Sequence, residues 1–312
     1  MITFGPVISR RLGKSLGINN IPSRKLCSYS CIYCQVGVTK YYTIHRETFF
    51  TPEVIYKEVE NHLSSLSEND KPDYLTFVAN GEPTLDINLG KTICRLKDFN
   101  IPTAVITNAS LLSDAQVREE LCNTDIVSVK VDAPSETVWK KLNRPAKGLI
   151  FSKYLTGLQA FKDMYTGKLI TETMLVEGVN NDAETITQTA TLVAALSPAI
   201  AYISIPTRPP AVSSVKAPDE SNINRAWNLF SNKKIKTELN TGFEGTYVGV
   251  TGNAIEDIVN MCSVHPIRDD VMIEILRRDT ADEQILAELI SNGYIVKVEH
   301  DHHFYYLRKF NV

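Results

Sequence analysis

Short apolar runs recur along most of the chain and alternate with longer stretches that have helical spacing. The clearest runs cover residues 73–80, 101–108, 125–133, 168–176 and 199–206. Their length and composition are typical of buried strands, and a further strand is expected near residues 15–22. Strands that alternate with helices predict a parallel sheet. Six such units are fewer than the eight of a closed barrel, so we expect an α/β fold with an incomplete, TIM-like (β/α)6 barrel.

Two helix starts stand out between these runs. Thr51 precedes Pro52, and proline at the first helical position loses no hydrogen bond. Ser113 and Gln116 have the spacing of a capping box, which predicts a helix that begins after Ser113. In parallel α/β folds the chemistry lies at the carboxyl ends of the strands. The residues that follow each apolar run are therefore the candidates for a site.

The pattern changes after about residue 262. Two short helices and an aromatic hairpin at 296–310 predict a small winged-helix-like module. We therefore expect a barrel domain over 1–262 and a second domain over 263–312. The module has 6 basic and 9 acidic residues, a net charge of −3. Because phosphate contacts supply most of the affinity for DNA, DNA binding is not expected, and the module binds protein or packs on the barrel.

Composition limits the location of the chain. No apolar run is long enough for a signal peptide or a membrane span, so we expect a cytoplasmic protein without membrane contact.

Residues 1–46 carry no Asp or Glu. A basic segment of this kind favours an anionic ligand or substrate, although a solvated basic surface is the alternative. Its basic residues are Arg10, Arg11, Lys14, Arg24, Lys25, Lys40 and Arg46.

Three of the 6 cysteines lie in one short loop, at Cys27, Cys31 and Cys34. Three thiolates within eight residues can turn toward one centre, which suits zinc or an iron-sulfur cluster. A structural zinc site needs a fourth ligand, and His45 is the next candidate in a chain without a second cysteine pair. A cubane held by three thiolates keeps one iron open, as a catalytic metal requires. We therefore predict a cluster, with a structural zinc loop as the alternative.

The loop, with Tyr33 before its last cysteine, resembles the hallmark motif of radical S-adenosylmethionine (radical SAM) enzymes. "NGEPTL" at 80–85 resembles the turn that binds the methionine amine in that superfamily. The segments 141–148, 175–182 and 206–210 resemble the branch with the tRNA wyosine-forming synthases and related uncharacterised iron-sulfur oxidoreductases. No cysteine precedes Cys27, which argues against a second cluster and against wyosine formation.

The resemblance implies a [4Fe-4S] cluster on Cys27, Cys31 and Cys34, whose open iron chelates the amino and carboxylate groups of S-adenosylmethionine. One electron then cleaves the sulfonium, and the resulting 5′-deoxyadenosyl radical removes hydrogen from a substrate. That substrate is an RNA base, a peptide or a small metabolite, and the enzyme is an oxidoreductase or transferase. A low-potential ferredoxin or flavodoxin is implied as the electron donor. The alternative is a non-catalytic iron-sulfur or zinc protein in electron transfer or redox-sensing regulation.

The resemblance also implies cofactor-binding roles. Gly81 and Glu82 are expected to shape the turn at the methionine amine, because glycine permits close backbone approach. Tyr33 is expected near the adenine or in packing. Asn108 ends the third run and is a candidate for contact with the ribose or the substrate.

Three further residues complete the predicted site. Lys130 and Asp132 are two apart on one strand, so their side chains are expected on the same face, paired with each other or with a cofactor ribose or carboxylate. Arg208 follows the last run and is expected to hold an anion with its planar guanidinium.

Overall fold

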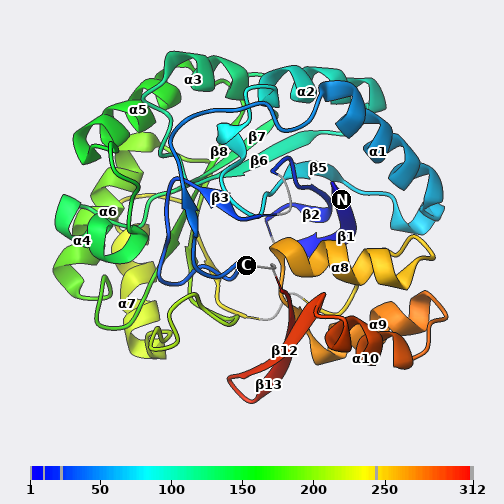
Figure 1. Ribbon diagram of the computed structural model, residues 1–312. Helices are drawn as coiled ribbons and strands as arrows, with labels where there is room; N and C mark the ends of the chain where they lie inside the picture. Colours follow the sequence, from blue (N-terminus) through cyan, green and yellow to red (C-terminus); the bar gives the residue numbers. More distant parts are fainter. Residues whose placement is uncertain (1, 10, 22–23, 243–244, 310–312) are drawn as a thin grey trace.

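The computed structural model (Figure 1) describes residues 2–9, 11–21, 24–242 and 245–309. Its central element is a curled sheet of eight strands in the order β1-β2-β5-β6-β7-β8-β9-β10. β1 and β2 are antiparallel, and the other neighbours are parallel. The strands are Thr3–Ser9 (β1), Gly13–Ile18 (β2), Tyr74–Phe77 (β5), Thr103–Thr107 (β6), Ile126–Lys130 (β7), Lys168–Met174 (β8), Ile200–Ser204 (β9) and Thr237–Asn240 (β10).

The partial barrel and its six predicted strands are confirmed, but β1 and β10 were not predicted. β1 contains Gly5 and Pro6 and shifts its register between Phe4 and Val7, so its sequence is typical of a turn. β10 is polar and half-buried at the sheet edge, and it has no apolar run. Arg10, Pro22 and Phe310, which belong to predicted segments, lie outside the described residues.

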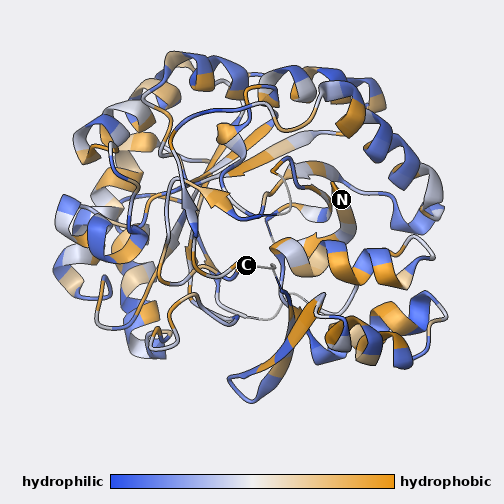
Figure 2. Cartoon of the chain, in the orientation of Figure 1, coloured by the Kyte–Doolittle hydropathy of each residue, from blue (hydrophilic) through white to orange (hydrophobic). Residues whose placement is uncertain are grey.

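Seven helices cover the outer face of the sheet (Figure 1). In Figure 2 the central strands are largely hydrophobic and the helices show both colours, as expected of amphipathic helices on a buried sheet. In the described part of the chain, none of the helices has the length and apolar character that crossing a membrane requires. The helices are Pro52–Ser65 (α1), Leu89–Leu96 (α2), Ala115–Leu121 (α3), Glu136–Asn143 (α4), Phe151–Met164 (α5), Ala183–Leu196 (α6) and Glu220–Ser231 (α7).

One predicted helix start is confirmed and the other is wrong by one residue. The Thr51 hydroxyl accepts a hydrogen bond from the Val54 amide at 3.3 Å and caps α1. α3 is capped by Asp114, whose carboxylate accepts from the Gln116 amide at 2.9 Å, and not by Ser113. A carboxylate at this position also faces the positive end of the helix dipole.

The strands divide their side chains between two cores. Val105, Val127 and Val129 face the helices in the main core. On the inner side of the barrel, Leu12 from the β1–β2 turn packs against Ile126 and other residues near the starts of the strands. The hairpin therefore closes the amino-terminal end of the barrel with apolar side chains, and the carboxyl end is left for a site.

The carboxyl-terminal module has the helix and strand order of a winged helix and a small antiparallel sheet, β11-β13-β12. α8 and the module share one apolar cluster that includes Ile258, Met272 and Ile295, and Phe4 of β1 joins it from the barrel. The module is therefore packed on the barrel through β1. α8 is Ala254–Val264, and the elements of the module are Ile267–Arg268 (β11), Asp269–Arg278 (α9), Gln284–Ser291 (α10), Ile295–His300 (β12) and His303–Arg308 (β13).

A buried ion pair also fastens the module. Arg278, at the end of α9, donates to both carboxylate oxygens of Asp70 at 2.7 and 2.8 Å. Asp70 belongs to the short 3-10 helix Glu68–Asp70 (η1) and also accepts from the Tyr247 hydroxyl. Burial alone would raise the pKa of Asp70, but the hydrogen bonds from Tyr247 and Arg278 lower it to about 2.

We expect Asp70→Asn to lower the free energy of unfolding at pH 7 by about 3 kcal/mol, because it leaves Arg278 without its charge partner. The unfolded pKa of an aspartate is about 3.9. Since the folded pKa of Asp70 is about 2, its contribution is complete above pH 4 and disappears as the pH falls toward 2. Urea denaturation of both proteins from pH 7 to pH 2 measures this difference.

The control is Glu68→Gln in the same 3-10 helix, because Glu68 pairs with Lys71 at the exposed surface. An exposed pair contributes about 0–1 kcal/mol, so this variant should behave like the wild type. Equal effects of the two substitutions would show that the Asp70 pair does not fasten the module.

Candidate active site

The cysteine loop lies over the carboxyl end of the barrel. Cys27 ends the short strand Leu26–Cys27 (β3), which pairs in parallel with Tyr41–Tyr42 (β4). Two successive tight turns follow, in which the Cys34 amide donates to the Cys31 carbonyl and the Gly37 amide donates to the Cys34 carbonyl. Cys27 and Cys34 line a cavity of about 280 Å³ at the mouth of the barrel. The loop thus presents two of its three thiols to this cavity.

Each of the three thiols has an N–H donor from a different side chain. Asn108 Nδ2 lies 3.6 Å from Cys27 Sγ, and Asn143 Nδ2 lies 3.4 Å from Cys31 Sγ. Lys25 Nζ lies 3.1 Å from Cys34 Sγ. The donors point at sulfur, as donors do at thiolates that hold a metal cluster.

Burial raises the pKa values of Cys27 and Cys31 to about 12. Without a metal these two thiols keep their protons at neutral pH, whereas ligation to a metal removes the proton. The donor set therefore fits a soft metal centre that supplies the missing positive charge.

In the part of the chain that the structure describes, the three thiols are not gathered round a single point. Among the residues that the structure describes, no three His, Cys, Asp or Glu side chains are grouped closely enough to hold one metal ion. Ligands of a zinc ion all lie at about 2.0–2.3 Å from the same point, so they must be close to one another. Cysteines that bind different iron atoms of a cluster do not have to be.

The turn after β5 touches the strand that carries Cys27. The Glu82 amide donates to the Leu26 carbonyl at 3.0 Å. A Cβ atom on Gly81 would lie only 1.6 Å from that carbonyl oxygen, so glycine is required at this close approach. Gly81 also lines the cavity. The turn and the cysteine loop are thereby held as one unit.

The Glu82 carboxylate, which is 1% exposed, points away from the cavity. It accepts hydrogen bonds from Thr84 Oγ1 at 2.7 Å, Thr107 Oγ1 at 2.5 Å and the Asn108 amide at 2.8 Å. Burial raises the pKa of Glu82, although these hydrogen bonds oppose the shift. The side chain therefore joins the turn to the end of β6, and only the backbone of the turn faces a ligand.

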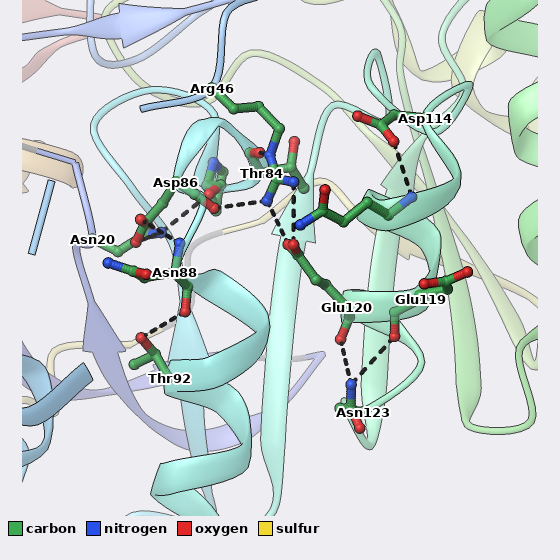
Figure 3. Close-up of polar contacts among 12 residues, drawn as sticks. Asn20, Arg46, Thr84, Asp86, Asn88, Thr92, Asp114, Glu119, Glu120 and Asn123 are labelled. Carbon is green, nitrogen blue, oxygen red and sulfur yellow. Dashed lines mark hydrogen bonds and ion pairs between the residues drawn. The ribbon is translucent and has the colours of Figure 1, made fainter. Parts of the chain in front are cut away.

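Arg46 supports this turn from outside the cavity (Figure 3). Its guanidinium donates to the Thr84 carbonyl and the Asp86 carbonyl, both at 2.9 Å, and forms an ion pair with Glu120. Sequence reasoning counted Arg46 only among the basic residues that favour an anionic ligand. The structure uses its charge within the protein. The sequence signal for this role was an arginine that follows the cysteine loop. Its partner Glu120 is too distant in the chain for sequence spacing to identify the pair.

Four of the seven residues predicted to bind the cofactor line the cavity: Tyr33, Gly81, Lys130 and Arg208. Glu82, Asn108 and Asp132 are not among the lining residues. Asn108 Nδ2 donates to Ser28 Oγ at 2.9 Å in addition to its contact with Cys27, so it supports the cysteine loop.

Asp132, two residues after the end of β7, anchors the same loop. Its carboxylate accepts hydrogen bonds from the Tyr33 hydroxyl, from Asn143 Nδ2 at 2.9 Å and from the Met174 amide at 2.8 Å. Burial raises the pKa of Asp132, and the charge of Lys130 opposes that shift. Tyr33 thus contributes its ring to the cavity while its hydroxyl is fixed by Asp132.

Of the two predicted alternatives for Lys130, pairing with Asp132 is wrong, and pairing with a ligand stays a prediction. Lys130 forms an ion pair with Glu172 at 2.7 Å. β7 ends at Lys130, so the alternation of a strand does not extend to Asp132. Lys130 is instead directly opposite Glu172 in the register of β7 and β8.

Glu172 also forms an ion pair with Arg11, which comes from the turn between β1 and β2. Ser204 Oγ donates to the same carboxylate at 2.9 Å. Burial alone would raise the pKa of Glu172, but the charges of Arg11 and Lys130 lower it to about 2. All four residues line the cavity, and one part of its wall therefore carries two cations and one carboxylate.

The carboxyl-terminal module completes the wall. Val264 and His265 line the cavity together with Arg208. Gln35 of the cysteine loop connects the barrel to the module. Its side chain accepts a hydrogen bond from Arg208 Nη1 at 3.0 Å and donates one to the Val264 carbonyl at 3.0 Å. Burial and the charge of Arg208 hold the pKa of His265 well below its usual value, which keeps the imidazole neutral.

A second cavity of about 280 Å³ lies between the barrel and the module. Arg208 and His265 line both cavities, so the two spaces adjoin. Tyr305 of β13 lines the second cavity and donates through its hydroxyl to the Thr207 carbonyl at 3.1 Å. The module is therefore part of the site and not a separate appendage.

Comparison with known families agrees with this geometry. The family model of the radical SAM superfamily matches residues 21–190, which include the cysteine loop and the turn at Gly81. The chain belongs to the radical SAM superfamily, as the sequence motif predicted.

Within it, the chain belongs to the family of UPF0026 proteins. It is 45% identical to the UPF0026 protein MJ1312 of Methanocaldococcus jannaschii over 309 residues, which cover 98% of this chain and 96% of the relative. It is 33% identical to a UPF0026 protein of Helicobacter pylori, with 94% and 89% covered.

Solved structures with the same fold are distant in sequence. A structure of TYW1 with a lysine-pyruvate adduct bound has a TM-score of 0.55 at 16% identity and covers 71% of this chain and 75% of that one. Streptococcus suis SuiB bound to S-adenosylmethionine has a TM-score of 0.52 at 11% identity, with 71% and 49% covered. Both confirm the partial barrel of this superfamily.

We expect Gly81→Ala to reduce the iron that the reconstituted protein retains, because the added methyl group would displace Leu26 and with it Cys27. Overpacking of this kind costs about 1–3 kcal/mol or more. Iron analysis and the visible absorbance of the cluster measure the effect. Gly178→Ala is the control, since a Cβ atom there meets nothing within 4 Å and the substitution adds only the backbone strain of a φ of 68°. Equal iron in the two variants would contradict the prediction.

Proposed function

We propose that this protein is a radical SAM enzyme that holds a [4Fe-4S] cluster on Cys27, Cys31 and Cys34 and binds S-adenosylmethionine in the adjoining cavity. When bound, the cluster supplies the electron that cleaves S-adenosylmethionine into methionine and a 5′-deoxyadenosyl radical. The observation that carries the proposal is the position of the cysteine loop. Cys27, Cys34 and Gly81 line one cavity at the carboxyl end of the barrel.

Different residues of the chain bind the cluster and the different groups of S-adenosylmethionine. The three cysteines hold the cluster and leave one iron for the cofactor. The backbone around Gly81 lies beside Cys27, where its carbonyl groups can accept hydrogen bonds from the methionine amine. Arg11 and Lys130 supply positive charge for the methionine carboxylate. Tyr33 offers an aromatic ring to the adenosine.

The substrate is assigned to the second cavity. Its walls come from the barrel and the module, and it adjoins the cysteine cavity at Arg208 and His265. A group bound there would adjoin the cavity whose residues would hold the cofactor, and Tyr305 forms part of its wall. The size admits an RNA base, a peptide side chain or a small metabolite, from which a hydrogen atom is removed. The electron comes from a low-potential carrier of the ferredoxin or flavodoxin type.

We expect anaerobically reconstituted protein to form 5′-deoxyadenosine from S-adenosylmethionine and dithionite, as detected by chromatography. Cys31→Ala should abolish the product, because the cluster loses a ligand. Cys94→Ala should form it at the wild-type rate, since Cys94 is exposed on α2 and outside the cavity. A wild-type protein with a complete cluster and no product would overturn the enzyme function and favour an electron-transfer or sensing role.

A further inference from the structure

Lys25 is a buried lysine in the cysteine loop, and the residues that the structure describes give its charge no carboxylate partner. It is 6% exposed and lies two residues before Cys27. Its ammonium donates to Cys34 Sγ at 3.1 Å and to the Gly37 carbonyl. None of the ion pairs among the described residues joins Lys25 to an Asp or Glu. A buried ammonium without a counter-charge is costly, so the charge requires a partner.

The cysteines supply that partner. The ammonium lies 3.1 Å from Cys34 Sγ, so the thiolate that Cys34 becomes on binding a cluster is a negative charge in direct contact with it. Lys25 also lines the cavity, next to Cys27 and Cys34.

The side-chain hydrogen bonds to the other two cysteines come from neutral groups. Asn108 donates to Cys27, and Asn143 donates to Cys31. Among the described residues, Cys34 alone receives a side-chain hydrogen bond from a cation. The amides can orient the thiolates, whereas the lysine adds a full positive charge to one side of the loop.

A fixed positive charge next to a cluster changes its reduction. Reduction adds one negative charge to the cluster, and a nearby cation stabilises that charge more than it stabilises the oxidised form. The effect is larger in a buried position than in water because the surroundings screen it less. The expected consequence is a higher reduction potential, so that a donor of given strength reduces a larger fraction of the protein.

We propose that Lys25 sets the reduction potential of the cluster, through the positive charge that it holds against Cys34. The inference rests on the proposed function, because it requires a cluster on the three cysteines. In this role Lys25 acts on the cluster through Cys34 and does not touch the substrate. It is therefore a positioning residue and not a catalytic one.

The test uses reconstituted full-length protein without S-adenosylmethionine. The fraction of reduced cluster is followed by electron paramagnetic resonance during a potentiometric titration. We expect Lys25→Gln to lower the ratio of reduced to oxidised cluster about tenfold at the wild-type midpoint, a shift of about 59 mV for one electron. Lys25→Arg keeps the charge and should stay near the wild-type midpoint. Lys40→Gln removes an exposed lysine close to the same loop and should leave the midpoint unchanged.

The outcomes separate the possible failures. A wild-type protein that assembles no [4Fe-4S] cluster overturns the proposed function. An unchanged midpoint in Lys25→Gln with full iron content overturns only the role of Lys25. If the midpoint of Lys25→Gln is unchanged and this variant binds S-adenosylmethionine more weakly than the wild type, Lys25 is assigned to the cofactor carboxylate instead. If Lys25→Gln holds no cluster, the titration of Lys25→Arg decides whether the charge of Lys25 sets the potential. A midpoint of Lys25→Arg about 59 mV below that of the wild type would overturn the inference.

Discussion

The close packing of the turn at Gly81 against the backbone of Leu26 is the contact on which the site depends. It leaves no room for a side chain and brings the end of β5 to the strand that carries Cys27. The Glu82 amide and the Thr43 amide complete the contact, because they donate to the carbonyls of Leu26 and Cys27. The cysteine loop is therefore tied to the turn after β5 by the hydrogen bond from Glu82, while Thr43 and β4 hold its short strand from the other side.

Buried polar groups surround this contact in two layers. The first consists of Glu82, Asn108 and Asp132, whose hydrogen bonds hold the cysteine loop and the strand ends. The second consists of Arg11, Lys130 and Glu172, which place compensated charge at the cavity. Buried ion pairs are weak contributors to stability, so this second layer is better understood through ligand binding than through folding. The apolar core lies elsewhere, under the helices and at the base of the barrel.

The sequence predicted the strands and the candidate ligands that depend on a local pattern of residues. The runs that became β5 to β9 are apolar over several residues, and the cysteine spacing is local as well. It missed β1 and β10, because a strand that contains Gly5 and Pro6, or a polar edge strand, has no such pattern. The partners of Lys130 and Arg46 were also out of reach. Both are carboxylates more than forty residues along the chain, and only the sheet register and the turn bring them together.

The shared wall of the site has a consequence for the order of assembly. Cys34 and Val264 line the same cavity, yet they are far apart in the chain. At a synthesis rate of about 5–20 residues per second, the thiols leave the ribosome on the order of ten seconds or more before the last wall is made. The cysteine loop is therefore made before the module that completes the wall of its cavity. Docking of the module then adds Val264 and His265 to that wall, so the cavity takes its full shape last.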